Sequence, residues 1–490
     1  MEHVFQPGRI AEAVEVARTD GGTCVRKTVA SLTRRFGNLW ERCPATLPQL
    51  DQVPAKTRRA NQRRSAESLA RLDHHLLVAS EPGLDRDRWE RELREEFRGM
   101  LERLGAGVGQ PRPWKDLLSD SSFEVTATFL KQARAFGPEL RAEDHFQALR
   151  NVWIMNSIQL FRGAEVSSSP SILAYSLLYP FTDNVLDDPH LSQRAKSRFC
   201  RRLGRRLAGI RPAAPDAHEA KVFELVSMIE AEFPRARFPQ VFDSLLAIHH
   251  AQVKSLDMQG PAGLEAAPDL VSLTMEKGGT SVLADAYLLD GRLGDDEAEF
   301  QFGFGALLQL LDDAQDINED LQAGHQTLFS TAAGAQQALD ALWSRAFHFM
   351  DAVLETARCF PDDGRRAARD LVGRSCSLML MATAADNAGR FSPAYLLALE
   401  ASSPFGFAFL RRQRPALQRL RRRLAALPGG TPPLLSSSRR TSTRASKRPT
   451  RPPTAVPRPE GPGFVLPGFQ PDERLPNLVG VAARSVDCLG

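Results

Sequence analysis

The stretch "LLQLLDDAQDINEDLQAGHQTLF", from Leu307 to Phe329, begins as an apolar helix and ends in acids. Its nine central residues carry five carboxylates, at Asp312, Asp313, Asp316, Glu319 and Asp320. Like charges four residues apart destabilise a helix by a few tenths of a kcal/mol per pair, and burying them unpaired costs far more. Acids at the end of so apolar a helix therefore require an explanation.

Residues four positions apart lie on the same face of a helix. Asp312, Asp316 and Asp320 therefore form an acidic ladder, with Asp313 and Gln309 beside it. A solvated helix would interleave Lys or Arg to pair these acids, and none occurs between residues 300 and 328. Clustered hard oxygen ligands without Cys favour Mg²⁺, which binds through one or two carboxylates, its own waters and substrate phosphates.

A second acidic cluster lies about 130 residues earlier, in "YPFTDNVLDD". Asp183 and Asp187 are four apart, Asp188 is adjacent, and the preceding "SILAYSLLYPF" is again apolar. Pro180, one turn before Asp183, is expected to kink this helix. If the two acidic helix ends face each other across a bundle, they can clamp a Mg²⁺-bound diphosphate between them.

The rest of the chain reads as helical. The composition is 42% hydrophobic and 25% charged, with a net charge of +4, which fits a globular protein. Helical periodicity dominates from about residue 65 to 427, strand signals are scarce, and we expect about ten helices in an all-α fold. Ser169 is the expected N-cap of one helix, with Pro170 in its first turn, and Asp295 or Asp296 the N-cap of another.

Composition also divides the chain into three parts. Residues 1–110 are expected to be a helical, basic extension, with 26–64 a solvated face or loose segment. Residues 111–427 form the main domain. Residues 428–490 are rich in Pro, Ser and Arg and are predicted to be disordered.

The cysteine pattern and the lack of long apolar segments indicate the expected cellular compartment. The six cysteines are scattered and none forms a CxxC pair, which is compatible with a reducing cytoplasm and argues against a disulfide framework. We find no signal peptide and no apolar run near 20 residues, so we expect no transmembrane helix and a cytoplasmic location. The basic tail is read as solvated, with no nucleic-acid partner.

The acidic segments resemble those of the class I isoprenoid synthase superfamily, whose all-α bundles carry two Asp-rich motifs across a central cavity. "LLQLLDDAQD" is similar to the second motif of trans-polyprenyl diphosphate synthases, and the same stretch also resembles that of squalene and phytoene synthases. "DNVLDD" fits both patterns in part, because Asn184 stands where polyprenyl synthases have a second Asp. The resemblance covers roughly residues 120–410.

The acids and the resemblance together predict the site. The expected catalytic acids are Asp183, Asp187, Asp312 and Asp316. The expected metal ligands are these four with Asp188, Asp313 and Asp320, holding several Mg²⁺ ions, for which Mn²⁺ can substitute. "LTMEKGGTSVLADAYLL" resembles an inter-motif helix whose Lys contacts the allylic diphosphate, which implies that role for Lys277. The other expected diphosphate contacts are Arg194, Arg202 and Gln309.

Aromatic side chains are candidates to stabilise a carbocation through their π faces, although each also suits an ordinary core. They are Tyr175, Tyr179, Phe181, Trp153 and Phe304. The Gly pair after Lys277 is expected to let its helix bend.

Three departures from the related families shape the functional expectation. There is no upstream Gly-Lys-Arg segment, no paired Arg in register after the first motif, and no Asn/Ser/Glu metal motif of microbial terpene cyclases. The leading expectation is a terpene synthase-like lyase that ionises one prenyl diphosphate and releases diphosphate. The alternatives are a prenyltransferase, either chain-elongating or head-to-head, and an inactive homologue acting as a partner subunit. A homodimer is compatible with each.

Overall fold

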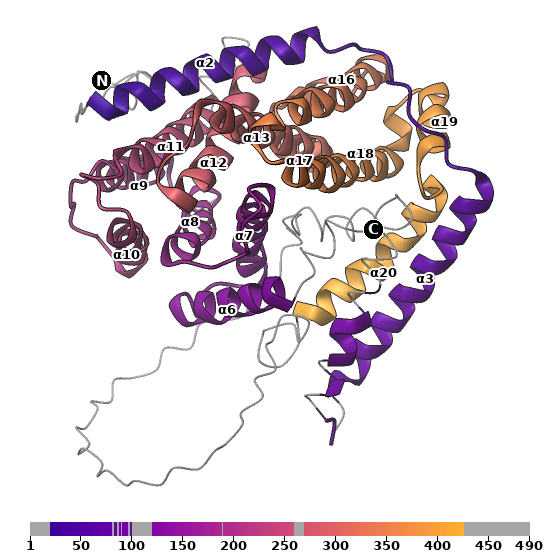
Figure 1. The fold of residues 1–490 in the computed structure, drawn as a ribbon, viewed down its shortest axis with the longest axis horizontal. Coiled ribbons are helices and arrows are strands. Elements are labelled where there is room, and N and C mark those ends of the chain that lie inside the picture. The colour runs from indigo at the N-terminus through magenta and orange to yellow at the C-terminus, as the bar shows by residue number, and fades with distance from the viewer. Residues whose placement is uncertain are drawn as a thin grey trace.

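The structure is a computed structural model that describes residues 20–80, 83–85, 88–89, 91–96, 99, 120–188, 190–258 and 269–425. Every regular element in these ranges is a helix, which confirms the predicted all-α class (Figure 1). None of the described helices combines the length and apolar character needed to cross a bilayer. The predicted disordered tail lies outside the described residues.

The helices before the first acidic cluster and around it are α2 (Asp20–Arg42), α3 (Ala55–Leu77), α6 (Asp120–Phe136), α7 (Ala142–Phe161), α8 (Pro170–Leu186), α9 (Gln193–Leu207) and α10 (Ala217–Glu232). Those that follow are α11 (Pro239–Met258), α12 (Leu270–Asp290), α13 (Asp295–Gln315), α14 (Ile317–Ala323), α15 (Leu328–Ala332), α16 (Gln336–Glu355), α17 (Asp362–Ala368), α18 (Arg374–Asp386), α19 (Pro393–Ser402) and α20 (Phe407–Ala425). The helices exceed the ten expected because several, such as α14 and α15, are too short to show periodicity.

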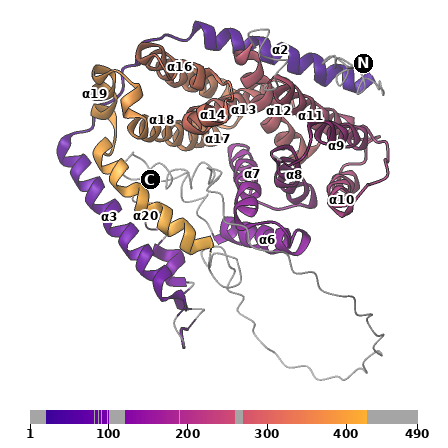
Figure 2. The ribbon, with the colours of Figure 1, turned by 180° about the vertical axis from the view of Figure 1, so that it is seen from behind.

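Helix α12 is the centre of the bundle. It packs against α11 and α13 most extensively and also contacts α2, α7 and α8 (Figures 1 and 2). A Cβ on Gly278 would lie 2.3 Å from the carbonyl oxygen of Gly305, and one on Gly305 would lie 2.1 Å from that of Gly278. These two glycines therefore let the backbones of α12 and α13 touch. Helix α12 runs unbroken through the Gly pair.

The N-terminal helix α2 is part of the core, so the expectation of a loose segment over 26–64 is wrong there, although Arg26, Lys27 and Arg34 form the alternative that was expected, a solvated face. Phe36 and Trp40 are each 1% exposed and contact the ring of Phe349 on α16. Helix α2 lies along α11 and α12 in both views (Figures 1 and 2). It thus shares a hydrophobic core with the domain predicted to begin at residue 111.

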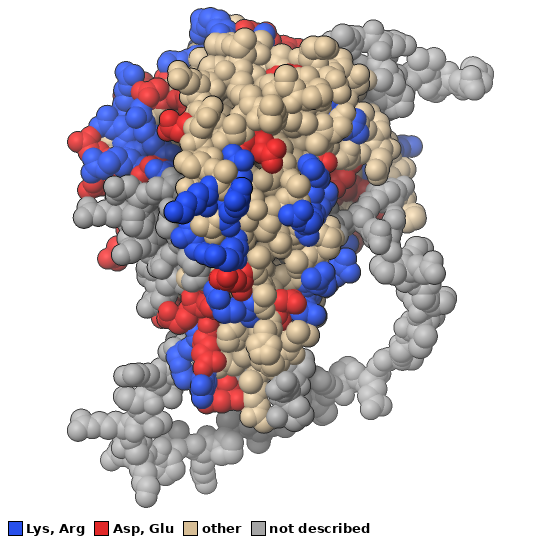
Figure 3. Space-filling view, turned by 90° about the vertical axis from the view of Figure 1, so that its right-hand side faces the viewer, with Lys and Arg blue, Asp and Glu red and all other residues tan. Residues whose placement is uncertain are grey.

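Helices α3 and α20 pack together and carry many cations. Helix α20 holds seven Arg and no acid, and α3 holds six Lys or Arg and two acids. The side of the molecule that bears them shows several clusters of Lys and Arg (Figure 3). The basic stretch in α3 is therefore solvated, as expected, but on a regular helix.

The helix starts around the acidic segments follow local chemistry. Ser169 caps α8 by accepting a hydrogen bond from the Ile172 amide at 3.3 Å, as predicted. Helix α8 continues through Pro180 to Leu186. The N-cap of α13 is Gly294, not Asp295 or Asp296, which instead lie in the first turn, where the helix dipole favours acids.

Candidate functional site

The end of α8 holds Asp183 among neutral amide donors. Gln147 on α7 donates to Oδ2 of Asp183 at 2.6 Å, and Gln252 on α11 donates to Oδ1 at 2.9 Å. Burial raises the pKa of Asp183 to about 6, and repulsion from Asp187 adds to it, while the two amides and Lys277 lower it. Holding this carboxylate charged therefore costs free energy, and a bound cation would offset that cost.

The end of α13 holds a buried acid, Asp313, which is 9% exposed, whereas Asp183 is only partly buried. Gln309 donates to Oδ1 of Asp313 at 2.8 Å, and the hydroxyl of Thr274 on α12 donates to its Oδ2 at 3.2 Å. Burial raises the pKa of Asp313 to about 7, Lys277 and Gln309 lower it, and Asp312 raises it. Gln309 thus orients an acid of the site. Asp313 lies inside the site, whereas the helical spacing predicted that Asp313 lies beside the acidic ladder.

The acidic ladder is interrupted where α13 ends. Helix α13 ends at Gln315 and α14 begins at Ile317, so Asp316 lies at the junction, where its side chain hydrogen-bonds to Glu319. One turn on, Asp320 accepts a hydrogen bond from the Thr327 hydroxyl at 3.2 Å.

Cations for the ladder come from other helices. Nη2 of Arg150 on α7 lies 3.6 Å from Oδ1 of Asp312, and Lys277 on α12 lowers the pKa of Asp313. The prediction that these acids are unpaired was therefore wrong. Helix periodicity describes neighbours within one helix and gives no information on partners that come from other helices.

Lys277 connects the two acidic helix ends. Its ammonium lowers the pKa of Asp183 at the end of α8 and of Asp313 at the end of α13. His325, just after α14, is a second link. A hydrogen bond to Asp320 raises the pKa of His325, and Asp187 of the other end raises it further. The two ends are thus close enough to act electrostatically on the same groups.

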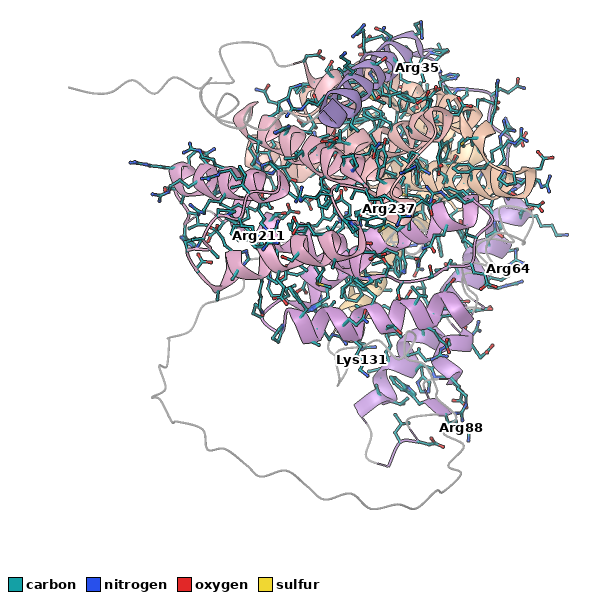
Figure 4. The ribbon with its side chains drawn as sticks, turned by 60° about the vertical axis from the view of Figure 1, so that its left-hand side comes forward. Arg35, Arg64, Arg88, Lys131, Arg211 and Arg237 are labelled. Carbon is teal, nitrogen blue, oxygen red and sulfur yellow. The ribbon has the colours of Figure 1, made fainter. Side chains whose placement is uncertain are left out.

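The remaining predicted residues lie at the margin or elsewhere. Asp188 accepts a hydrogen bond from the His190 amide at 2.8 Å and so stabilises the turn after α8. Arg194 is exposed at the start of α9. Nε of Arg202 donates to Glu219 on α10 at 2.7 Å, so this guanidinium is engaged within the fold. The cations labelled in Figure 4 likewise lie exposed, on different helices and connections.

The described residues contain no group of three or more His, Cys, Asp or Glu side chains arranged to hold a metal ion. The donor chemistry nevertheless suits Mg²⁺, because the site offers carboxylate oxygens and no thiolate. Mg²⁺ commonly takes only one or two protein carboxylates and completes its shell with water and phosphate. The predicted ligands remain Asp183, Asp187, Asp188, Asp312, Asp313, Asp316 and Asp320.

An apolar cavity of about 60 Å³ lies beside Asp183, between α8, α9 and α11. The cavity is lined by Thr182, which precedes Asp183 in the chain, and by Gln252, which donates a hydrogen bond to Asp183. Of the five candidate aromatics, only Tyr175 and Tyr179 line the cavity. Phe181 and Phe304 are completely buried in the core.

Sequence reasoning missed three residues that hold the acids: Gln147, Gln252 and Thr274. Gln147 and Arg150 are three apart on α7, so they share a face, which was the available signal. No comparable signal marks Gln252 or Thr274, because their role depends on how α11 and α12 pack. No protein-family model, curated protein sequence or solved structure matches this chain.

Proposed function

We propose that this protein is a Mg²⁺-dependent enzyme that ionises an allylic prenyl diphosphate and releases diphosphate. The observation that carries the proposal is the position of Lys277, which acts on acids at the ends of both α8 and α13. A diphosphate is a compact polyanion, and a site for it needs fixed cations among groups that hold metal. Two acidic helix ends around one Lys offer that arrangement.

The chain's own residues have distinct roles in this proposal. Gln147 and Gln252 orient Asp183, while Gln309 and Thr274 orient Asp313. Bound Mg²⁺ would neutralise charge on the departing diphosphate. Lys277 would contribute a further fixed charge at the same place.

The cavity beside Asp183 is proposed to receive the prenyl chain. Its volume of about 60 Å³ is room for only a few water molecules, whereas small-molecule sites usually span roughly 300–1,000 Å³. Binding a prenyl chain would therefore require the lining to move. Leu178, Leu203 and Leu245 supply an apolar lining that would exclude water from a carbocation.

A lyase acting on one diphosphate is favoured over chain elongation. Elongation needs a second diphosphate site with its own cations, because two polyanions repel each other. Arg162, the residue directly after α7, pairs with Asp290 and Glu297 at 2.6 Å each. Arg150, on α7, pairs with Asp312. Neither is available as it stands for a second diphosphate.

The test is incubation of the purified protein with C10 to C25 prenyl diphosphates and Mg²⁺, with and without labelled isopentenyl diphosphate. Diphosphate release with a hydrocarbon or alcohol product is expected, and chelation of the metal should abolish it. Label in a longer prenyl diphosphate would establish the prenyltransferase alternative. Absence of release from every substrate would favour an inactive partner subunit.

A further inference from the structure

The lining of the cavity beside Asp183 includes one imidazole, that of His249. Four of the lining side chains carry ionisable groups: Tyr175, Tyr179, Cys200 and His249. The Tyr175 hydroxyl donates to the Ser281 carbonyl at 3.2 Å, and the Tyr179 hydroxyl bonds that of Ser281 at 2.6 Å. Burial raises the pKa of both tyrosines, so both stay protonated and are poor proton acceptors.

His249 differs from these groups. Its side chain is 8% exposed, and its Nε2 is buried with no hydrogen-bond partner among the described residues. The ring hydrogen-bonds to the backbone of Cys200, so that bond engages Nδ1. A ring that donates its Nδ1 proton to a carbonyl keeps a lone pair on Nε2. Burial and the neighbouring His250 lower the pKa of His249 to about 4, so the ring is neutral near pH 7.

The position of His249 relates it to the acidic site. It precedes Gln252 by three residues, so both lie on one face of α11. Gln252 holds Asp183 and lines the cavity, and His249 lines the same cavity. An allylic cation formed beside Asp183 would therefore leave its apolar chain next to the imidazole.

We propose that Nε2 of His249 is the proton acceptor that ends the reaction and makes the product a hydrocarbon. This inference rests on the proposed function. The C–O bond breaks with both electrons going to the diphosphate oxygen. A C–H bond next to the cationic carbon then gives its electron pair to a new C=C bond, and its proton moves to Nε2. The imidazolium, disfavoured by burial, passes that proton to diphosphate or solvent.

Imidazole is suited to this step. The other polar groups in the lining, the Thr182 hydroxyl and the Gln252 amide, are far weaker bases, and both donate elsewhere, to Leu178 and to Asp183. A carbocation gives up a neighbouring proton even to a weak base, so depressed basicity does not disable the imidazole. A base in the cavity lining competes with water for the cation, which is why its loss should change the product.

The experiment compares wild type with His249→Leu and His249→Gln, using the prenyl diphosphate that gives most diphosphate release. Both variants should keep diphosphate release within about tenfold of wild type. The ratio of hydrocarbon to alcohol should fall at least tenfold in both. His250→Gln is the matched control, because this neighbour lines a separate polar groove between α2, α11 and α12, and it should keep the wild-type ratio.

The outcomes separate the two proposals. An unchanged product ratio in a folded variant that still releases diphosphate would overturn the role of His249 alone, as would a wild-type product that is mainly alcohol. If His249→Leu does not fold, His249→Gln decides, because it retains polarity while removing the base. Absence of diphosphate release by wild type would overturn the proposed function itself, and this inference with it.

Discussion

The two acidic helix ends hold their carboxylates in different ways. At the end of α8, Asp183 is bound by the neutral amides of Gln147 and Gln252, and Asp187 repels it. At the end of α13, Lys277 is the strongest influence lowering the pKa of Asp313, and Arg150 pairs with the adjacent Asp312. The α13 end is thus partly neutralised by the fold, whereas Asp183 at the α8 end is hydrogen-bonded by neutral donors, so the proposed cation would have more charge to offset there.

Removing one of the two hydrogen-bonded acids, Asp183 or Asp313, should have the largest effect. Asp183→Asn and Asp313→Asn should each lower Mg²⁺-dependent diphosphate release by about a thousandfold, the upper range for losing one preorganised electrostatic group. Far-UV circular dichroism should show an intact fold, because removing a repelled charge does not destabilise the metal-free protein. Asp188→Asn is the control and should change release only a few-fold, since Asp188 serves the turn at His190. Near-wild-type diphosphate release by Asp183→Asn would contradict the hypothesis that both acidic helix ends hold one Mg²⁺-diphosphate.

The metal-free protein should lose stability with rising pH through Asp313. Burial raises the pKa of Asp313 in the folded protein to about 7 from its ordinary 3.8. The folded protein therefore keeps a proton that the unfolded chain releases, and stability falls as pH rises from about 4 to 7. Relative to Asp313→Asn, wild type should lose a few kcal/mol across this window. Denaturant unfolding in a chelator measures it, and parallel pH profiles would contradict it.

The charge shared by both ends can be removed in Lys277→Met. Losing one charge-assisted contact to diphosphate costs about 2 kcal/mol, so diphosphate release should fall about thirtyfold. Lys277→Arg should recover part of the loss. Equal rates in wild type and Lys277→Met would show that the two ends do not share this residue.

The smallest expected effect comes from the close approach of α12 and α13. Gly278→Ala places a methyl against the Gly305 carbonyl and should destabilise the fold by roughly 1–3 kcal/mol. It should also move Lys277 relative to Gln309 and lower activity. Gly334→Ala is the matched control, because nothing lies within 4 Å of its added methyl. Equal melting temperatures of the two variants would contradict the packing argument.

The sequence predicted what periodicity and local chemistry encode. The all-α class and the Ser169 cap followed from helical spacing and side-chain preference. The burial of α2 was not predicted because the segment is rich in basic residues. Its apolar stripe, which includes Phe36 and Trp40 four residues apart, is narrow. The partners of the acids, Gln252 and Arg150, come from other helices, and only tertiary packing brings them to Asp183 and Asp312.

The most direct test of a single shared site is the binding of inorganic diphosphate by isothermal titration calorimetry, with and without Mg²⁺. Wild type, Asp183→Asn, Asp313→Asn and the double variant form a mutant cycle. If both ends bind one Mg²⁺-diphosphate, wild type binds diphosphate only when Mg²⁺ is present. The fold loss of affinity in the double variant is then at least tenfold smaller than the product of the fold losses in the two single variants. Independent, additive losses, or equal binding without Mg²⁺, would contradict the account.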